Sequence, residues 1–133
     1  ATDASGSVFT SFSFERGQVL VTQAFALSAA NLSQSHFLSE PAVSGAAQGA
    51  TTDARGNLYI VEPALQELIL ISTASERTID RYAIPVVSGI SLLGLAAQDV
   101  AVAADGTVYV VVTDSQNAVD GPGAVLRYRR VSR

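Results

Sequence analysis

The chain contains no cysteine and no lysine. Without thiols it can form no disulfide, use no thiolate nucleophile and hold no zinc through sulfur, and cysteine pairing gives no information on the redox compartment. Its eight cationic residues are all arginines, against twelve acidic residues, which gives a net charge of −4. The only cationic cluster is Arg127, Arg129, Arg130 and Arg133. We therefore expect no nucleic-acid partner, because phosphate binding needs an extended cationic face.

No apolar run reaches the 18 or so residues that a membrane-spanning helix needs, so we expect no membrane span. Hydrophobic residues nevertheless make up 48% of the 133 residues, enough to bury a core. The sequence begins Ala1-Thr2-Asp3, without a charged segment followed by an apolar core. We expect a mature or fragment chain, and a removed secretory signal would make the protein extracellular.

An internal repeat is the strongest pattern in the sequence. Segments 41–61 and 85–111 both have the form P-x-V-S-G-A-A-Q, then eight residues to a glycine, then a polar residue and aliphatic-Tyr-aliphatic-Val, once the insertion 90–95 is set aside. A third, weaker copy precedes them around Gly17, where Leu20 replaces the tyrosine. The pattern predicts one domain over 1–133 with repeats at about 7–41, 45–85 and 94–133.

Each repeat is typical of short strands, rich in Val, Ile, Tyr and Thr and bounded by Gly, Asp, Asn and Pro. The best copy predicts strands at roughly 49–53, 57–62, 66–72 and 78–84. Gly56 and Gly106 supply the positive φ that a tight hairpin turn needs. We predict an all-β fold of tandem four-stranded antiparallel, propeller-like blades, since one small twisted sheet cannot bury both faces until neighbours stack on it.

Segments 52–62 and 102–111, T-D-A-R-G-N-L-Y-I-V-E and V-A-A-D-G-T-V-Y-V-V, resemble the A-V-D-x-x-G-N-L-Y-V-A-D signature of NHL-type and SMP-30/gluconolactonase-like β-propellers. Segment 123–128 resembles the strand that follows in those families. The resemblance covers about 45–128 and implies a propeller. Those rings have about six blades, whereas this sequence supplies a partial ring of about three, and the last repeat lacks a fourth strand. We therefore expect self-association or a missing remainder of the ring, because exposed edges and faces favour association.

In the resembling lactonases a divalent cation in the central channel activates water and polarises the ester carbonyl, held by acidic and amide side chains. The resemblance makes Gln48, Asp53, Gln98 and Asp99 candidates for channel-facing positions here. They are equally ordinary inner-strand residues. Gln48 and Gln98 recur at equivalent repeat positions, which suggests that they bond the backbone of a neighbouring blade.

Other candidate sites are isolated. Asp114, Asn117 and Asp120 place three oxygen-bearing side chains in one loop, which a hard cation such as Ca²⁺ could use, although a plain hairpin loop has the same composition.

Asn31 begins an Asn-Leu-Ser glycosylation sequon. His36 has no second histidine or cysteine to complete a metal site, and Ser91 lies in a segment that only approaches a nucleophile motif.

Two functions remain open from the sequence. The first is an extracellular binding or structural module that engages a protein or glycan ligand or assembles with itself. The second is a metal-dependent lactonase or esterase-like hydrolase whose site forms only in a completed propeller channel. The absence of a nucleophile constellation favours the first.

Overall fold

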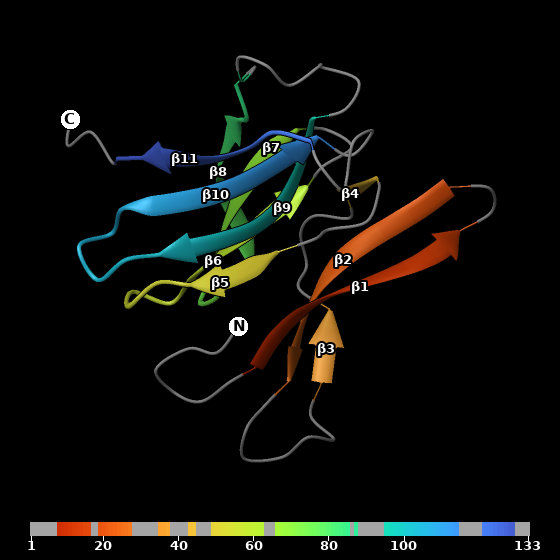
Figure 1. Cartoon of the computed structure of the whole chain (residues 1–133). Helices are drawn as coiled ribbons and strands as arrows, with labels where there is room; N and C mark the ends of the chain where they lie inside the picture. Colours follow the sequence, from red (N-terminus) through yellow and green to blue (C-terminus); the bar gives the residue numbers. More distant parts are fainter. Residues whose placement is uncertain are drawn as a thin grey trace.

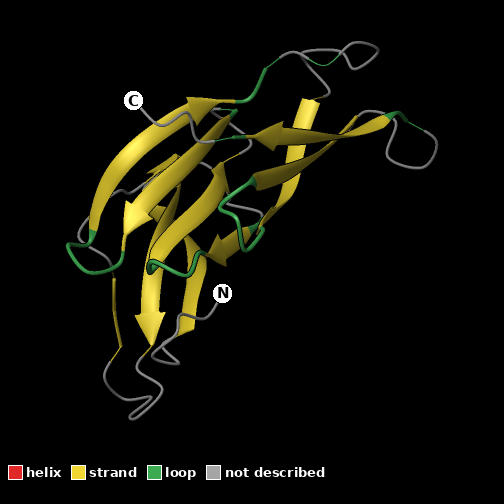
Figure 2. Ribbon diagram, turned by 90° about the vertical axis from the view of Figure 1, so that its left-hand side faces the viewer, coloured by secondary structure: helices red, strands yellow, loops and turns green. Residues whose placement is uncertain are grey.

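The computed structural model describes the backbone of residues 8–16, 19–27, 35–37, 43–44, 49–62, 66–85, 87, 95–114 and 121–129, and side chains from residue 49 onward. Every regular element in these ranges is a β-strand, and all strand pairing is antiparallel (Figure 2). The strands form three separate sheets that do not close on one another. The predicted all-β class is confirmed. Among the described residues there is no helix long and apolar enough to cross a membrane.

The first sheet comprises β1 (Val8–Arg16), β2 (Val19–Leu27), β3 (Ser35–Phe37) and β4 (Val43–Ser44). Strand β1 pairs with β2 along its whole length, and β3 and β4 pair with different parts of β2. This order differs from the simple four-strand meander expected of a blade. The weaker first repeat of the sequence therefore corresponds to a sheet of a different topology.

The second sheet follows the strongest repeat. It contains β5 (Ala50–Thr52), β6 (Asn57–Glu62), β7 (Glu67–Ser72) and β8 (Arg77–Ala83), paired in chain order. These bounds lie within about two residues of the predicted strands. Both faces of β6 and β7 are buried, because apolar side chains occupy successive positions rather than alternate ones.

The third sheet contains β9 (Leu95–Val102), β10 (Val108–Asp114) and β11 (Gly123–Tyr128) in the order β11-β10-β9. In the described residues this sheet has three strands. Gln98 is the extra residue of a bulge, because Asp99 pairs with Val111 while Ala97 pairs with Val112.

The second and third sheets pack face to face. Figure 1 shows the third sheet, teal to blue, in front of β6 to β8, with β5 next to β9. Their shared core contains the apolar residues Tyr59, Val61, Leu68, Leu70, Ile84, Ala97, Val100, Val108, Val110 and Val112. At the far edge, Tyr128 of β11 reaches the other sheet, where its hydroxyl donates to the Ala83 carbonyl at 3.4 Å.

Candidate functional site

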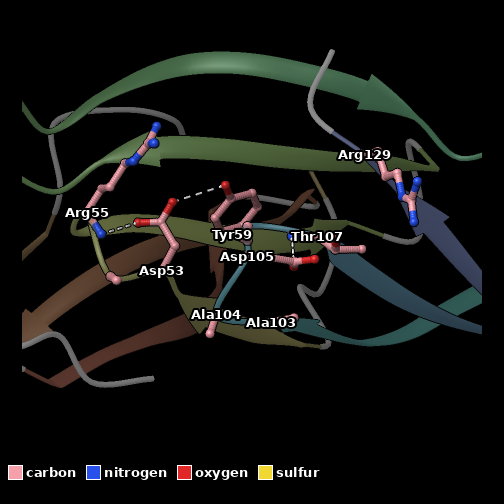
Figure 3. A pocket seen from close by; sticks show the side chains of 10 residues that line it. Asp53, Arg55, Tyr59, Ala103, Ala104, Asp105, Thr107 and Arg129 are labelled. Carbon is pink, nitrogen blue, oxygen red and sulfur yellow. Dashed lines mark hydrogen bonds between the residues drawn. The ribbon is translucent and has the colours of Figure 1, made fainter. Parts of the chain in front are cut away.

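A hollow of about 310 Å³ opens between two turns that occupy the same place in successive repeats. One is the β5–β6 turn around Gly56, and the other is the β9–β10 turn around Gly106. The two turns share their backbone geometry: Asp53 N donates to Asn57 O at 2.9 Å, and Ala103 N donates to Thr107 O at 2.9 Å. Both glycines have the predicted positive φ, at 76° and 81°. The hollow is therefore a product of the repeat, and Figure 3 shows the side chains that line it.

Asp53 holds the first turn together. Its Oδ1 accepts from the amides of Arg55 at 2.8 Å and Asn57 at 2.9 Å. Its Oδ2 accepts from Asn57 Nδ2 at 2.8 Å and the Tyr59 hydroxyl at 3.2 Å. Burial by itself would raise the pKa of Asp53, but these hydrogen bonds outweigh it and hold the pKa below the ordinary value of 3.8. Asp53 is thus a carboxylate at neutral pH and is already engaged at both oxygens.

Asp105 does the same work in the second turn from a different position. The residue equivalent to Asp53 is Ala103, which has no carboxylate. Asp105 Oδ1 instead accepts from Thr107 N at 2.9 Å, the amide equivalent to that of Asn57. The Thr107 amide and hydroxyl, followed by the nearby Arg129 charge, hold the pKa of Asp105 below its ordinary value. Each turn therefore has one anionic side chain on the same backbone amide.

Arg55 and Arg129 supply the positive charge of the hollow, from its two sides (Figure 3). Arg55 lies within the first turn, and Arg129 follows β11. Neither guanidinium forms an ion pair within the described part of the chain. By contrast, Arg81 on β8 pairs with Glu67 at 2.8 Å. The two arginines of the hollow are therefore available to an anionic group, which guanidinium binds through paired hydrogen bonds.

Three of the four predicted channel residues, Asp53, Gln98 and Asp99, lie in the described part of the chain. Asp53 lines the hollow, but Asp99 does not. Asp99 lies on β9, where its Oδ1 accepts from the amide of Val100 at 2.8 Å. Gln98 is exposed at the bulge, and Gln48 lies outside the described residues.

The other predicted sites are described only in part. Asp114 is buried at the end of β10, with 7% of its surface exposed. Asn117 and Asp120, its proposed partners for Ca²⁺, lie outside the described residues, as do Asn31 and Ser91. The backbone of His36 lies in β3. Among the residues that the structure describes, no group of three or more His, Asp or Glu side chains is placed to hold a metal ion.

Sequence reasoning missed Arg55, Tyr59, Asp105 and Arg129 as a group. The signal was present in the repeat, because the two turns align once the insertion is removed. In the sequence Arg129 is only one member of a cationic cluster, and no local pattern indicates that the residue after β11 lies beside the two turns. No model of a known protein family matches the chain, and a search of curated proteins finds no similar sequence.

Proposed function

We propose that this chain is an extracellular binding module of the β-propeller type, in which stacked blade-like sheets present their turns to a glycan ligand. The second and third sheets correspond to successive blades in this proposal. Its support is that they pack face to face with their first strands, β5 and β9, adjacent. The proposal also accords with the resemblance of segments 52–62 and 102–111 to NHL-type and SMP-30-like repeats.

The single observation on which the function rests is the hollow with Arg55 and Arg129 at its border. Its volume is at the lower end of the range for ligand pockets, so it can hold one sugar unit of a longer glycan. Two guanidinium groups favour a unit that has a carboxylate or sulfate. Asp53 and Asp105 keep their negative charges, so the lining is neutral overall. Their oxygens already accept hydrogen bonds from the turns, which leaves the two guanidinium groups as donors for an anionic group. The ligand class is therefore an acidic glycan.

The proposal predicts that a uronic-acid disaccharide binds in the hollow and a neutral disaccharide of the same size binds far more weakly. Replacing both arginines, Arg55→Ala with Arg129→Ala, should weaken acidic-sugar binding by at least about a hundredfold, because each charge-assisted hydrogen bond contributes about 1.5–3 kcal/mol and one is lost at each arginine. Calorimetric titration gives the affinity. Changes in the NMR chemical shifts of the Thr107 and Asn57 amides show whether the sugar binds in the hollow. Arg81→Ala is the matched control, since that arginine lies on β8 and pairs with Glu67.

Equal binding of the charged and neutral sugars, or no effect of the double variant, would contradict this function. Capture of an acidic peptide instead of the sugar would assign the hollow to a protein ligand. The hydrolase hypothesis makes a different prediction, namely cleavage of a lactone or ester that stops when a chelator is added. Because that site would form only in a completed ring, the assay is made on the assembled form of the chain, and binding of the acidic sugar with no hydrolysis there would exclude it.

A further inference from the structure

The third sheet has one buried face and one partly exposed face. Along β10 the side chains alternate, so that Val108, Val110 and Val112 face the second sheet. On the opposite face lie Tyr109 and Val111, together with Val125 and Arg127 of β11, which pair with them. These four residues are called here the free face of the third sheet. Its apolar members are 36%, 38% and 63% exposed for Tyr109, Val111 and Val125.

The equivalent positions of the second sheet indicate that this face can be covered by another sheet. Tyr109 and Val111 are equivalent to Tyr59 and Val61, which follow Gly56 at the same spacing as the first pair follows Gly106. Tyr59 is only 6% exposed and Val61 is fully buried, because the third sheet covers them. The same two positions are thus covered in one sheet and uncovered in the next. A further sheet of the same kind would extend the stack by the contact already present between the second and third sheets.

Charge indicates that a second copy of the chain can supply that sheet. Residues 121–133 contain four arginines and no acidic residue, whereas residues 1–120 contain the other four arginines and all twelve acidic residues, a net charge of −8. Arg127 is exposed on the free face itself. It is the only basic residue described there, and the exposed Asp99 of β9, which pairs with Val111, lies beside this face. The opposite charges of segments 121–133 and 1–120 therefore favour association between copies through their long-range attraction rather than through a basic face.

We propose that the free face of the third sheet binds a second copy of this chain, head to tail, in continuation of the internal stack. Such a contact joins different surfaces of the two copies, so it can be repeated or can close a ring. The inference rests on the proposed function in one respect, since it names the partner that completes the stack of blades. It does not depend on the hollow, whose lining includes none of the four free-face residues.

Light scattering behind size exclusion tests the proposal on the purified chain, whose mass is 13.8 kDa. The wild type should exceed that mass and should dissociate on dilution. Val125→Lys should weaken the association by at least about tenfold, because it places an unpaired charge in an apolar contact. Ile79→Lys is the matched control: Ile79 is an apolar residue, 48% exposed, on β8 of the second sheet, and its change should leave the mass unaltered.

Two further variants protect the test from a folding artefact. Val125→Thr keeps the β-branched shape and strand preference and should weaken association to a smaller extent. Arg127→Glu should weaken association and reduce its sensitivity to salt, because it removes the basic charge of the face. Circular dichroism checks that each variant keeps its strands.

A wild type that is monomeric at every concentration would overturn the inference, as would equal effects of Val125→Lys and Ile79→Lys. Binding of the acidic disaccharide is measured separately on the Val125→Lys variant. If Val125→Lys loses association but still binds the sugar, both proposals are supported. If Val125→Lys loses association and neither it nor the wild type binds the sugar, the proposed contact stands and only sugar binding in the hollow is refuted.

Discussion

At the scale of single residues, two glycines at equivalent positions of the repeat have the same backbone conformation. Gly56 and Gly106 have φ values of 76° and 81°, a region that a residue with a Cβ rarely occupies. Their surroundings differ. A Cβ at Gly56 would lie 3.2 Å from Thr73 Oγ1, whereas a Cβ at Gly106 would meet no atom within 4 Å.

Alanine substitutions at these two glycines distinguish the cost of backbone strain from the cost of steric crowding. Gly106→Ala should destabilise the chain by about 1 kcal/mol, the usual cost of a left-handed conformation for alanine. Gly56→Ala should cost more, because the Thr73 hydroxyl that bonds the Gly56 carbonyl must also move. Chemical denaturation gives the free energy of unfolding of both variants. A loss for Gly106→Ala as large as that for Gly56→Ala would contradict the role of Thr73.

At the scale of elements, each hairpin turn depends on one carboxylate. The folded-state pKa of Asp53 is lowered, so its contribution to stability is complete above the ordinary value of 3.8 and is lost as the pH falls below that value through the lower folded pKa. Protonation removes acceptor capacity from a carboxylate whose two oxygens accept from four donors. The stability of the β5–β6 turn should therefore decline in acid.

Replacing Asp53 with asparagine tests this. At pH 7 the variant should be less stable than the wild type by about 1–2 kcal/mol, because one acceptor oxygen becomes a donor opposite the Asn57 amide group. The difference between the two proteins should shrink as the pH falls below 3.8, since the wild type then loses the same charge. Denaturation curves at pH 7, 4 and 3 measure the difference. A difference that stays constant with pH would mean that the charge of Asp53 does not matter.

Elements were predictable from the sequence where local chemistry determines them. The strands of the second sheet follow from glycine turns and runs of β-branched residues, so their bounds were predicted closely. The role of Asp105 was not predictable, because in the third sheet the carboxylate comes from the position of Arg55 rather than that of Asp53. A motif search that expects the acid at one position passes over such a change, although both acids bond the same backbone amide.

At the scale of the whole molecule, the hollow on which the proposed function rests depends on contacts between repeats, which a single repeat does not show. The hollow exists because β5 and β9 are adjacent and because Arg129, at the end of β11, returns to the two turns. The first sheet shows that a repeat in the sequence does not by itself determine how strands pair. Its residues suggested a third blade, but β2 pairs with both β3 and β4, a pairing that no alternation of apolar residues specifies.

Gly49 tests how closely the two stacked sheets depend on each other. It occupies the repeat position of Asp99, and the two residues touch: a Cβ at Gly49 would lie 2.5 Å from Asp99 Cα and 2.8 Å from Val100 N. These are backbone atoms of β9, so Gly49→Ala must push the second and third sheets apart. The loss of stability should be about 1–3 kcal/mol, the usual range for overpacking.

Gly123→Ala is the matched control, because its nearest contact would be an ordinary 3.4 Å to the Val112 carbonyl oxygen. Its effect on the free energy of unfolding should be small. Amide hydrogen exchange should rise along β5 and β9 in Gly49→Ala but not in Gly123→Ala. Since the hollow lies between the turns that follow these strands, the first variant should also weaken acidic-sugar binding without touching any residue of the hollow. Unchanged exchange and binding in Gly49→Ala would show that the sheets are not held together at this point.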